Sequence, residues 1–171
     1  NNVNIDKLSL PSVSILSEYS FSMCQNLITV DLPNCTIIKR SAFENCKKLQ
    51  KINLPKVEKL EAYSFSSTSL TKIELNSVKI LDKENGRQFY NCLKLTHVTM
   101  KSVEMIQNSM FENCNKLIYV DFPNVTFIGV KSFIGCHSLN NITFPKLKSI
   151  GASSFKGNQG ITTINLDKVE I

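Results

Sequence analysis

Residues 27–48 read LITVDLPNCTIIKRSAFENCKK, and this stretch contains one complete copy of a pattern that recurs throughout the 171-residue chain. Phenylalanine identifies the pattern most clearly, because it recurs with a 22-residue period that is broken by one interval of 24. Three further columns of mostly aliphatic residues keep the same step. A unit of this size cannot bury its apolar edge alone, so the units are expected to stack into one continuous core. The Phe column comprises Phe21, Phe43, Phe65, Phe89, Phe111, Phe133 and Phe155.

The spacing inside the quoted unit predicts two short strands and a turn. Leu27, Val30 and Leu32 are spaced as in a short strand with a bend at its start. Pro33 has a fixed backbone angle and no amide donor, which suits the exit from a strand. A second short apolar stretch ends at Ile38, and a polar turn then leads to Phe43. Repetition of this unit predicts a solenoid of stacked strands.

Two motifs in the unit, Leu-x-x-Val-x-Leu-Pro at 27–33 and Ser-Ala-Phe-Glu-Asn-Cys at 41–46, indicate a family. With them the chain resembles the BspA-like (Treponema-type) leucine-rich repeats. The resemblance implies a leucine-rich-repeat, right-handed, β-rich solenoid with parallel strands and about 22 residues per repeat. We expect a single domain over residues 1–171, with seven full repeats and a partial eighth. The resemblance further implies a cell-surface or secreted protein used for adhesion to host matrix, host cells or other microbes.

Two units depart from the 22-residue step. The interval from Phe65 to Leu70 is one residue short, and the interval from Leu75 to Phe89 contains three extra residues. The extra residues fall within 82–88, where Asn-Gly predicts a small bulged loop. This loop is either a contact site or a tolerated surface insertion, and we favour the second. Neither end carries a polar capping unit, so we expect a segment of a longer protein or ends that another chain covers.

The composition argues against several classes of function. The chain has 20 Lys and Arg against 14 Asp and Glu, a net charge of +6, but no run of basic residues suited to nucleic acid. No apolar stretch approaches the roughly 18 residues of a membrane span. Trp is absent and His occurs twice, and no Ser-His-Asp or paired-carboxylate arrangement recurs in the repeat frame. We therefore expect neither an enzyme nor a protein that holds a metal or another cofactor.

Six cysteines raise the question of disulfides or a metal site. Five of them lie three residues after the repeat Phe, where Thr68 and Asn158 occupy the same column. A small side chain that can hydrogen-bond free backbone groups suits such a position. There is no Cys-x-x-Cys pair, so zinc is the least favoured alternative. We expect buried, reduced thiols, with a disulfide between neighbouring turns as the second alternative. Reduced thiols do not fix the compartment, and they are also compatible with the cytoplasm.

The variable positions of the first strand in each unit are expected to face solvent and to line the concave side of the solenoid. They include three Lys and four acidic residues, so this face is near neutral overall. We expect shape and hydrogen bonds to govern binding there, with apolar anchors where the sequence offers them. Exposed strand positions rich in Thr are also explained by strand propensity alone. The candidate ligand-binding residues are Ile28, Thr29, Lys51, Lys72, Thr96, His97, Ile118 and Tyr119.

A second column is apolar where strand alternation predicts an outward side chain. If the second stretch of each unit is a strand, this column forms an exposed apolar stripe suited to a partner or to self-association. If the stretch is irregular, the side chains turn inward, and we favour this alternative of a core or partly shielded column. The candidate self-association residues are Ile37, Ile80, Met105 and Phe127.

The preferred hypothesis is therefore a non-catalytic binding or adhesion module of a cell-surface or secreted protein. It would recognise a protein or glycan through the exposed strand face, without nucleic acid as a partner and without a membrane span. The second hypothesis is a structural spacer that has no ligand of its own. The third hypothesis is a repeat segment that self-associates through the apolar column.

Overall fold

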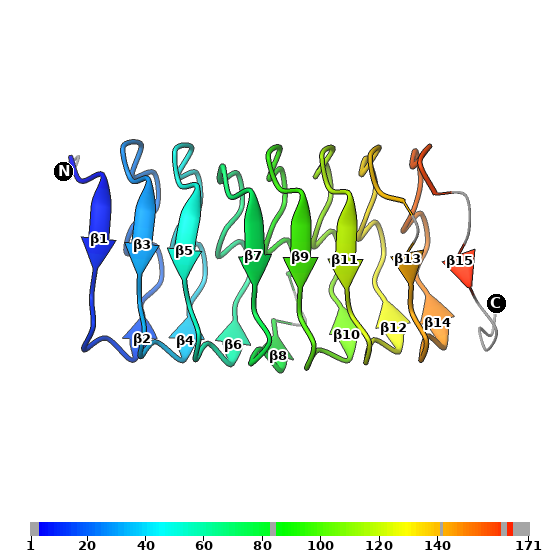
Figure 1. Cartoon of the computed structure of the whole chain (residues 1–171), viewed down its shortest axis with the longest axis horizontal. Coiled ribbons are helices and arrows are strands. Elements are labelled where there is room, and N and C mark those ends of the chain that lie inside the picture. Colours follow the sequence, from blue (N-terminus) through cyan, green and yellow to red (C-terminus); the bar gives the residue numbers. More distant parts are fainter. Residues whose placement is uncertain (1–3, 83–84, 141, 162–163, 166–171) are drawn as a thin grey trace.

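The structure, a computed structural model, describes residues 4–82, 85–140, 142–161 and 164–165. These residues contain short parallel strands and no helix. The strands form two series that alternate along the chain, one across the front of the solenoid in Figure 1 and one below it. Each turn contributes one strand to each series. Paired residues of regular neighbouring turns differ by 22 in sequence number, as Lys7 and Thr29 do. The chain is thus an all-parallel β-solenoid, as the repeat predicts.

The first series follows the Leu-x-x-Val-x-Leu pattern, and its paired strands keep residues of one sequence column beside one another. Leu8 pairs with Val30, and Val30 pairs with Ile52. The central residue of each triplet points into the core while its two neighbours point outward, because side chains alternate along a strand. The series comprises β1 (Lys7–Ser9), β3 (Thr29–Asp31), β5 (Lys51–Asn53), β7 (Lys72–Glu74), β9 (His97–Thr99), β11 (Tyr119–Asp121), β13 (Ile142–Thr143) and β15 (Ile164–Asn165).

The second series follows the proline and consists of two-residue strands. The second residue of each strand lies in the core and the first lies outside, as in Ile37 and Ile38. The series comprises β2 (Ile15–Leu16), β4 (Ile37–Ile38), β6 (Lys59–Leu60), β8 (Ile80–Leu81), β10 (Met105–Ile106), β12 (Phe127–Ile128) and β14 (Ser149–Ile150).

The phenylalanine column forms a continuous stack of rings inside the solenoid. Consecutive ring centroids from Phe21 to Phe155 lie 5.3 to 5.8 Å apart, with interplanar angles of 2 to 13°. The five central rings, from Phe43 to Phe133, are fully buried. The longer sequence interval between Phe65 and Phe89 leaves the stack intact, with centroids 5.5 Å apart. The prediction that the Phe column is interior is confirmed.

The turn around each Phe forms a third ladder of hydrogen bonds, whereas the sequence predicts only a polar turn there. The amide of Phe43 donates to the carbonyl of Ser64, and the equivalent bonds run from Phe21 to Phe133 at 2.8 to 3.0 Å. The residues two before and two after each Phe have positive φ, as at Ser41 and Asn45. This left-handed conformation favours Asn and Gly, which explains their frequency two residues after the Phe.

The two strand series are interrupted where the repeat length changes, whereas the turn ladder is not. The first series divides between β5 and β7, at the turn that is one residue short. The second series divides between β8 and β10, on either side of the three extra residues. Part of the predicted bulged loop, Lys83 and Glu84, lies outside the described residues.

We predict that Phe111→Ala lowers the free energy of unfolding by about 3–5 kcal/mol, because it leaves a ring-sized cavity in the middle of the stack. Chemical denaturation followed by far-ultraviolet circular dichroism measures this change. Ile118→Ala is the matched control, because Ile118 is 42% exposed and its truncation removes little buried surface. A loss below about 1 kcal/mol for Phe111→Ala would show that the stack contributes little to stability.

Candidate ligand-binding surfaces

The solvent-facing side chains of the first strand series form two parallel rows across the solenoid. The strand register places residues of one row side by side, as for Lys72, His97 and Tyr119. On each strand the two rows are separated by one inward residue, a distance of roughly 7 Å. The basic row consists of Lys7, Thr29, Lys51, Lys72, His97 and Tyr119, and the acidic row consists of Ser9, Asp31, Asn53, Glu74, Thr99 and Asp121.

Charge is segregated between these rows. The basic row contains three lysines and no acid, and the acidic row contains three acids and no lysine. In the described part of the chain, the one ion pair within 4 Å joins Lys59 and Glu61, which lie in and beside the second series. The charges of the two rows therefore do not neutralise one another by direct contact. The strand face is near neutral overall, as the sequence predicts, but it has a positive side and a negative side.

An aromatic pair ends the basic row. The rings of His97 and Tyr119 lie 5.9 Å apart and are tilted by 41°. His97 Nδ1 is 2.9 Å from the hydroxyl of Thr96, and that hydroxyl donates to the carbonyl of Thr71. Tyr119 is 48% exposed, and the neighbouring Ile118 is also exposed. These contacts orient the imidazole and leave the phenol ring open to solvent.

The eight candidate residues predicted on this face do not form one pocket. Thr29 and Lys51 lie in the basic row on the sheet β1-β3-β5. Lys72, His97 and Tyr119 continue this row on the sheet β7-β9-β11. The other three, Ile28, Thr96 and Ile118, immediately precede strands β3, β9 and β11.

A groove with a volume of about 480 Å³ lies between these two sheets, where the first series is divided. Asn53 lines one side, and Lys72 and Glu74 line the other. Of these three residues, only Lys72 is among the candidates predicted from the sequence. The shortened turn between Phe65 and Leu70 was the signal that could have located the groove, because a missing residue disturbs the pairing of β7 with β5.

The outward column of the second series is a mixture of exposed and half-buried side chains. The preference for an inward or shielded column is wrong for Ile15, Ile80 and Met105, which are exposed. Ile37 and Phe127 are half-buried and fit the partly shielded alternative. The reason is that the second stretch forms a true strand, so alternation directs its first residue outward. The four residues predicted for self-association therefore follow one face, and their role in association stays a prediction.

The cysteines are free, and four of them are hydrogen-bonded to the turn of the preceding unit. The thiols of Cys92, Cys114 and Cys136 are buried and donate to the carbonyls of Phe65, Phe89 and Phe111 at 3.1 Å. Cys46 makes the same contact with Phe21. The prediction of reduced thiols that bond free backbone groups is confirmed for these positions. Burial raises the pKa of Cys136 to about 12, so this thiol is protonated at neutral pH.

A comparison with known protein families identifies the family that has this repeat. The model of the BspA-type leucine-rich repeat region matches residues 1–118 and 104–171. The chain belongs to the BspA-type leucine-rich repeat family. No curated protein sequence matches this BspA-type chain.

In the described part of the chain, no helix is long and apolar enough to cross a membrane. In the same residues, no three His, Cys, Asp or Glu side chains converge in an arrangement that could hold a metal ion.

Solved structures share the fold of this BspA-type chain at low sequence identity. A leucine-rich repeat protein from Bacteroides ovatus is 23% identical with a TM-score of 0.65, over 95% of this chain and 55% of that one. One from Eubacterium ventriosum is 24% identical with a TM-score of 0.74, over 92% and 44%. The pneumococcal vaccine antigen PcpA is 18% identical with a TM-score of 0.52, over 91% and 55%. The BspA-type chain thus spans about half the length of these structures.

We predict that thiol reagents modify only Cys24 of the described cysteines while the protein is folded. Cys24 is half-buried, whereas the other five side chains are buried. Burial raises the pKa of Cys46 and of Cys136 to about 12, so the reactive thiolate forms only well above neutral pH. Iodoacetamide labelling at pH 8, read by peptide mass spectrometry before and after denaturation, measures this. Rapid labelling of Cys114 in the folded protein would contradict the structure.

Proposed function

We propose that this chain is a non-catalytic binding module of a cell-surface or secreted protein, and that its first-series strand face binds a protein partner. The segregation of lysines and acids into two rows is the observation that carries the proposal. A partner with an acidic strip beside a basic strip would meet opposite charge along both rows. Such complementarity steers association and selects one orientation of the partner.

The described contacts support this use of the face. The row lysines and acids project from short strands whose backbones are fixed by parallel pairing, so their spacing is set by the register of the turns. Tyr119 and Ile118 provide exposed apolar area at one end of the basic row. Large aromatic side chains of this kind contribute most of the affinity in many interfaces, while rim charges contribute mainly to rate and selectivity.

A glycan is the second candidate ligand, and the His97–Tyr119 pair favours it. The exposed Tyr119 ring has an apolar face, and the adjacent imidazole and Thr96 hydroxyl supply hydrogen-bonding groups. Protein is preferred because a neutral glycan would leave the two charged rows without partners.

Family membership and the shared fold support the class and the location. BspA-type repeats generally occur in non-catalytic binding proteins, and one structure with the same fold is a vaccine antigen. A structural spacer without a ligand is the alternative hypothesis, and the regularity of the solenoid favours it. The two hypotheses differ in one property, namely whether the strand face binds anything.

The test is binding to a panel of purified extracellular-matrix proteins and to a glycan array at about 0.15 M salt, where charges beyond roughly 8 Å are screened. We expect a matrix protein to bind, and Lys51→Glu/Lys72→Glu to weaken that binding by about tenfold or more. Lys101→Glu/Lys148→Glu is the matched control, because it changes the net charge equally at exposed positions outside the strand face. Binding should also weaken as salt is raised.

Three results would contradict the proposal. If neither the panel nor the array binds the chain, the spacer hypothesis is supported. If a ligand binds but the Lys51→Glu/Lys72→Glu and control variants behave alike, the strand face is not the binding site. A ligand found only on the glycan array, with binding lost in Tyr119→Ala, would assign the face to a glycan.

A further inference from the structure

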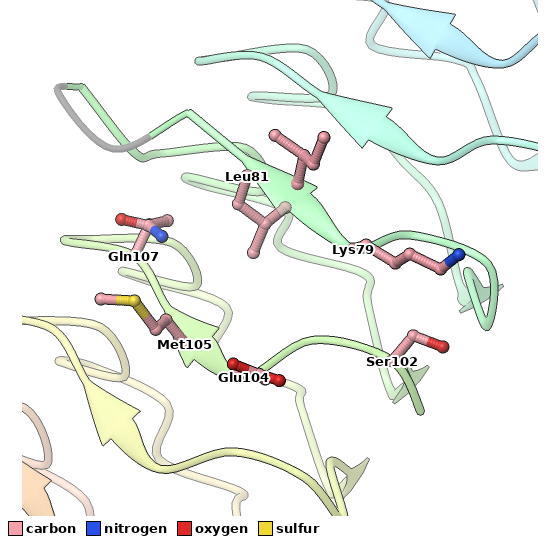
Figure 2. A pocket seen from close by; sticks show the side chains of 7 residues that line it. Lys79, Leu81, Ser102, Glu104, Met105 and Gln107 are labelled. Carbon is pink, nitrogen blue, oxygen red and sulfur yellow. The ribbon is translucent and has the colours of Figure 1, made fainter.

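A cleft with a volume of about 610 Å³ lies between β8 and β10 of the second strand series, whereas the charged rows lie on the first series. Figure 2 shows the two strands running in the same direction on opposite sides of this cleft. The volume is within the range of ligand sites in proteins. Its lining combines apolar and polar side chains and comprises Lys79, Ile80, Leu81, Ser102, Glu104, Met105 and Gln107.

At the cleft, the backbone hydrogen bonds that join neighbouring strands elsewhere in the second series are missing among the described residues. On the far side of β8, the amides of Lys79 and Asp82 donate to the carbonyls of Glu58 and Leu60. On the far side of β10, the carbonyls of Glu104 and Ile106 accept from the next turn at 2.8 Å. Each strand is therefore paired on the side away from the cleft. In the described residues, no backbone hydrogen bond joins β8 to β10.

The register of the other turns identifies the groups that face the cleft. By equivalence, these groups include the carbonyls of Lys79 and Leu81, at β8, and the amides of Glu104 and Gln107, which flank β10. Within the described residues, each wall of the cleft thus presents backbone groups that have no partner on the opposite strand. In an extended strand the N–H and C=O of one residue point to the same edge, so each edge carries both donors and acceptors, and a single strand that runs parallel to both walls would pair with both.

Two columns of side chains are also interrupted at the cleft. Ile80 is 56% exposed and Met105 is 36% exposed, and both belong to the outward column of the second series. Leu81 and Ile106 belong to the inward column and lie in the core. A strand between them would place one residue in each column. Two adjacent apolar residues are therefore the side chains that fit, as in the chain's own pairs Ile37-Ile38 and Phe127-Ile128.

We propose that the cleft between β8 and β10 binds one extended peptide segment with two adjacent apolar residues, which completes the divided sheet by pairing with both strands. This site is separate from the strand face and does not depend on the function proposed above. A second copy of this chain is the less suitable occupant. Its strands of this kind are already paired in its own solenoid, and β2, for example, has only one free edge.

The sequence interval between β8 and β10 is longer than the interval between other paired strands of the second series. The sequence numbers of Leu81 and Ile106 differ by 25, whereas those of the inward residues in other paired second-series strands differ by 21 or 22. Deletion of residues 83–85 restores a difference of 22. The shortened chain is expected to pair β8 directly with β10 and to lose the site, while the turn ladder through Phe89 and Phe111 stays in place.

The probe is a fluorescein-labelled peptide of sequence VTFIGV, which copies residues 125–130 and is amidated at its C-terminus. Fluorescence anisotropy with the full chain measures its affinity. We expect binding that weakens by about tenfold or more when alternate peptide amides are N-methylated, because this removes hydrogen bonds without changing side chains. The peptide VTDDGV should weaken to a similar extent, because it places charge in both apolar columns.

Protein variants test the location of the peptide. Deletion of residues 83–85 and Ile80→Glu should each reduce affinity for VTFIGV by about tenfold or more. Ile15→Glu is the matched control, because Ile15 is an exposed residue of the same column far from the cleft. It should bind the peptide as the unchanged chain does. If the deletion variant fails to fold, Ile80→Glu and the N-methylated peptide still decide the question.

Three outcomes would overturn the proposal. The first is absence of binding up to about 1 mM peptide, the weakest affinity of practical interest. The second is equal affinity for the unmodified and N-methylated peptides, which would show that backbone pairing is not involved. The third is a concentration-dependent dimer that the peptide displaces, detected by analytical ultracentrifugation, which would assign the cleft to a second copy of the chain.

Discussion

The ring stack and the hydrogen-bonded turns around it are the structural feature on which the rest of this solenoid depends. From Phe21 to Phe133, each Phe of the column contacts the ring of the next turn, and its amide donates to the next turn's backbone. The buried thiols add further bonds to the Phe carbonyls. This combination is continuous from Phe21 to Phe133, through both turns of irregular length. It sets the register that both strand series then follow.

Because the register is set in the Phe turns, changes in repeat length are accommodated in the strands. A turn that is one residue short divides the first series and opens a groove on the charged face. A turn with three extra residues divides the second series and opens the cleft between β8 and β10. Continuous sheets offer flat surfaces, whereas these two divisions provide concave sites with free backbone groups. In this molecule, departures from the repeat create the features most suited to recognition.

The sequence alone predicted the architecture well, because a strict period requires equivalent residues to occupy equivalent places. The Phe column, the strand order and the reduced state of the buried cysteines followed from that reasoning. The outward position of Ile80 and Met105 did not, because it depends on whether the second stretch is a strand or an irregular segment. The separation of charge on the strand face depends on the strand register, which assigns each charged residue to one row, whereas the composition of the whole face is near neutral. The groove and the cleft could not be predicted, because their positions depend on which hydrogen-bond ladder is interrupted when the repeat length changes. That choice is decided by packing in three dimensions.

Amide hydrogen exchange followed by nuclear magnetic resonance tests most directly whether the Phe turns hold the solenoid together. The amides of Phe89 and Phe111 should exchange only through global unfolding, because they lie in the continuous ladder. The amide of Glu104, at the division of the second series, should exchange through local opening and at least about a hundredfold faster. Slow exchange at Glu104 with fast exchange at Phe89 would show that the strands, and not the Phe turns, are the continuous element of the structure.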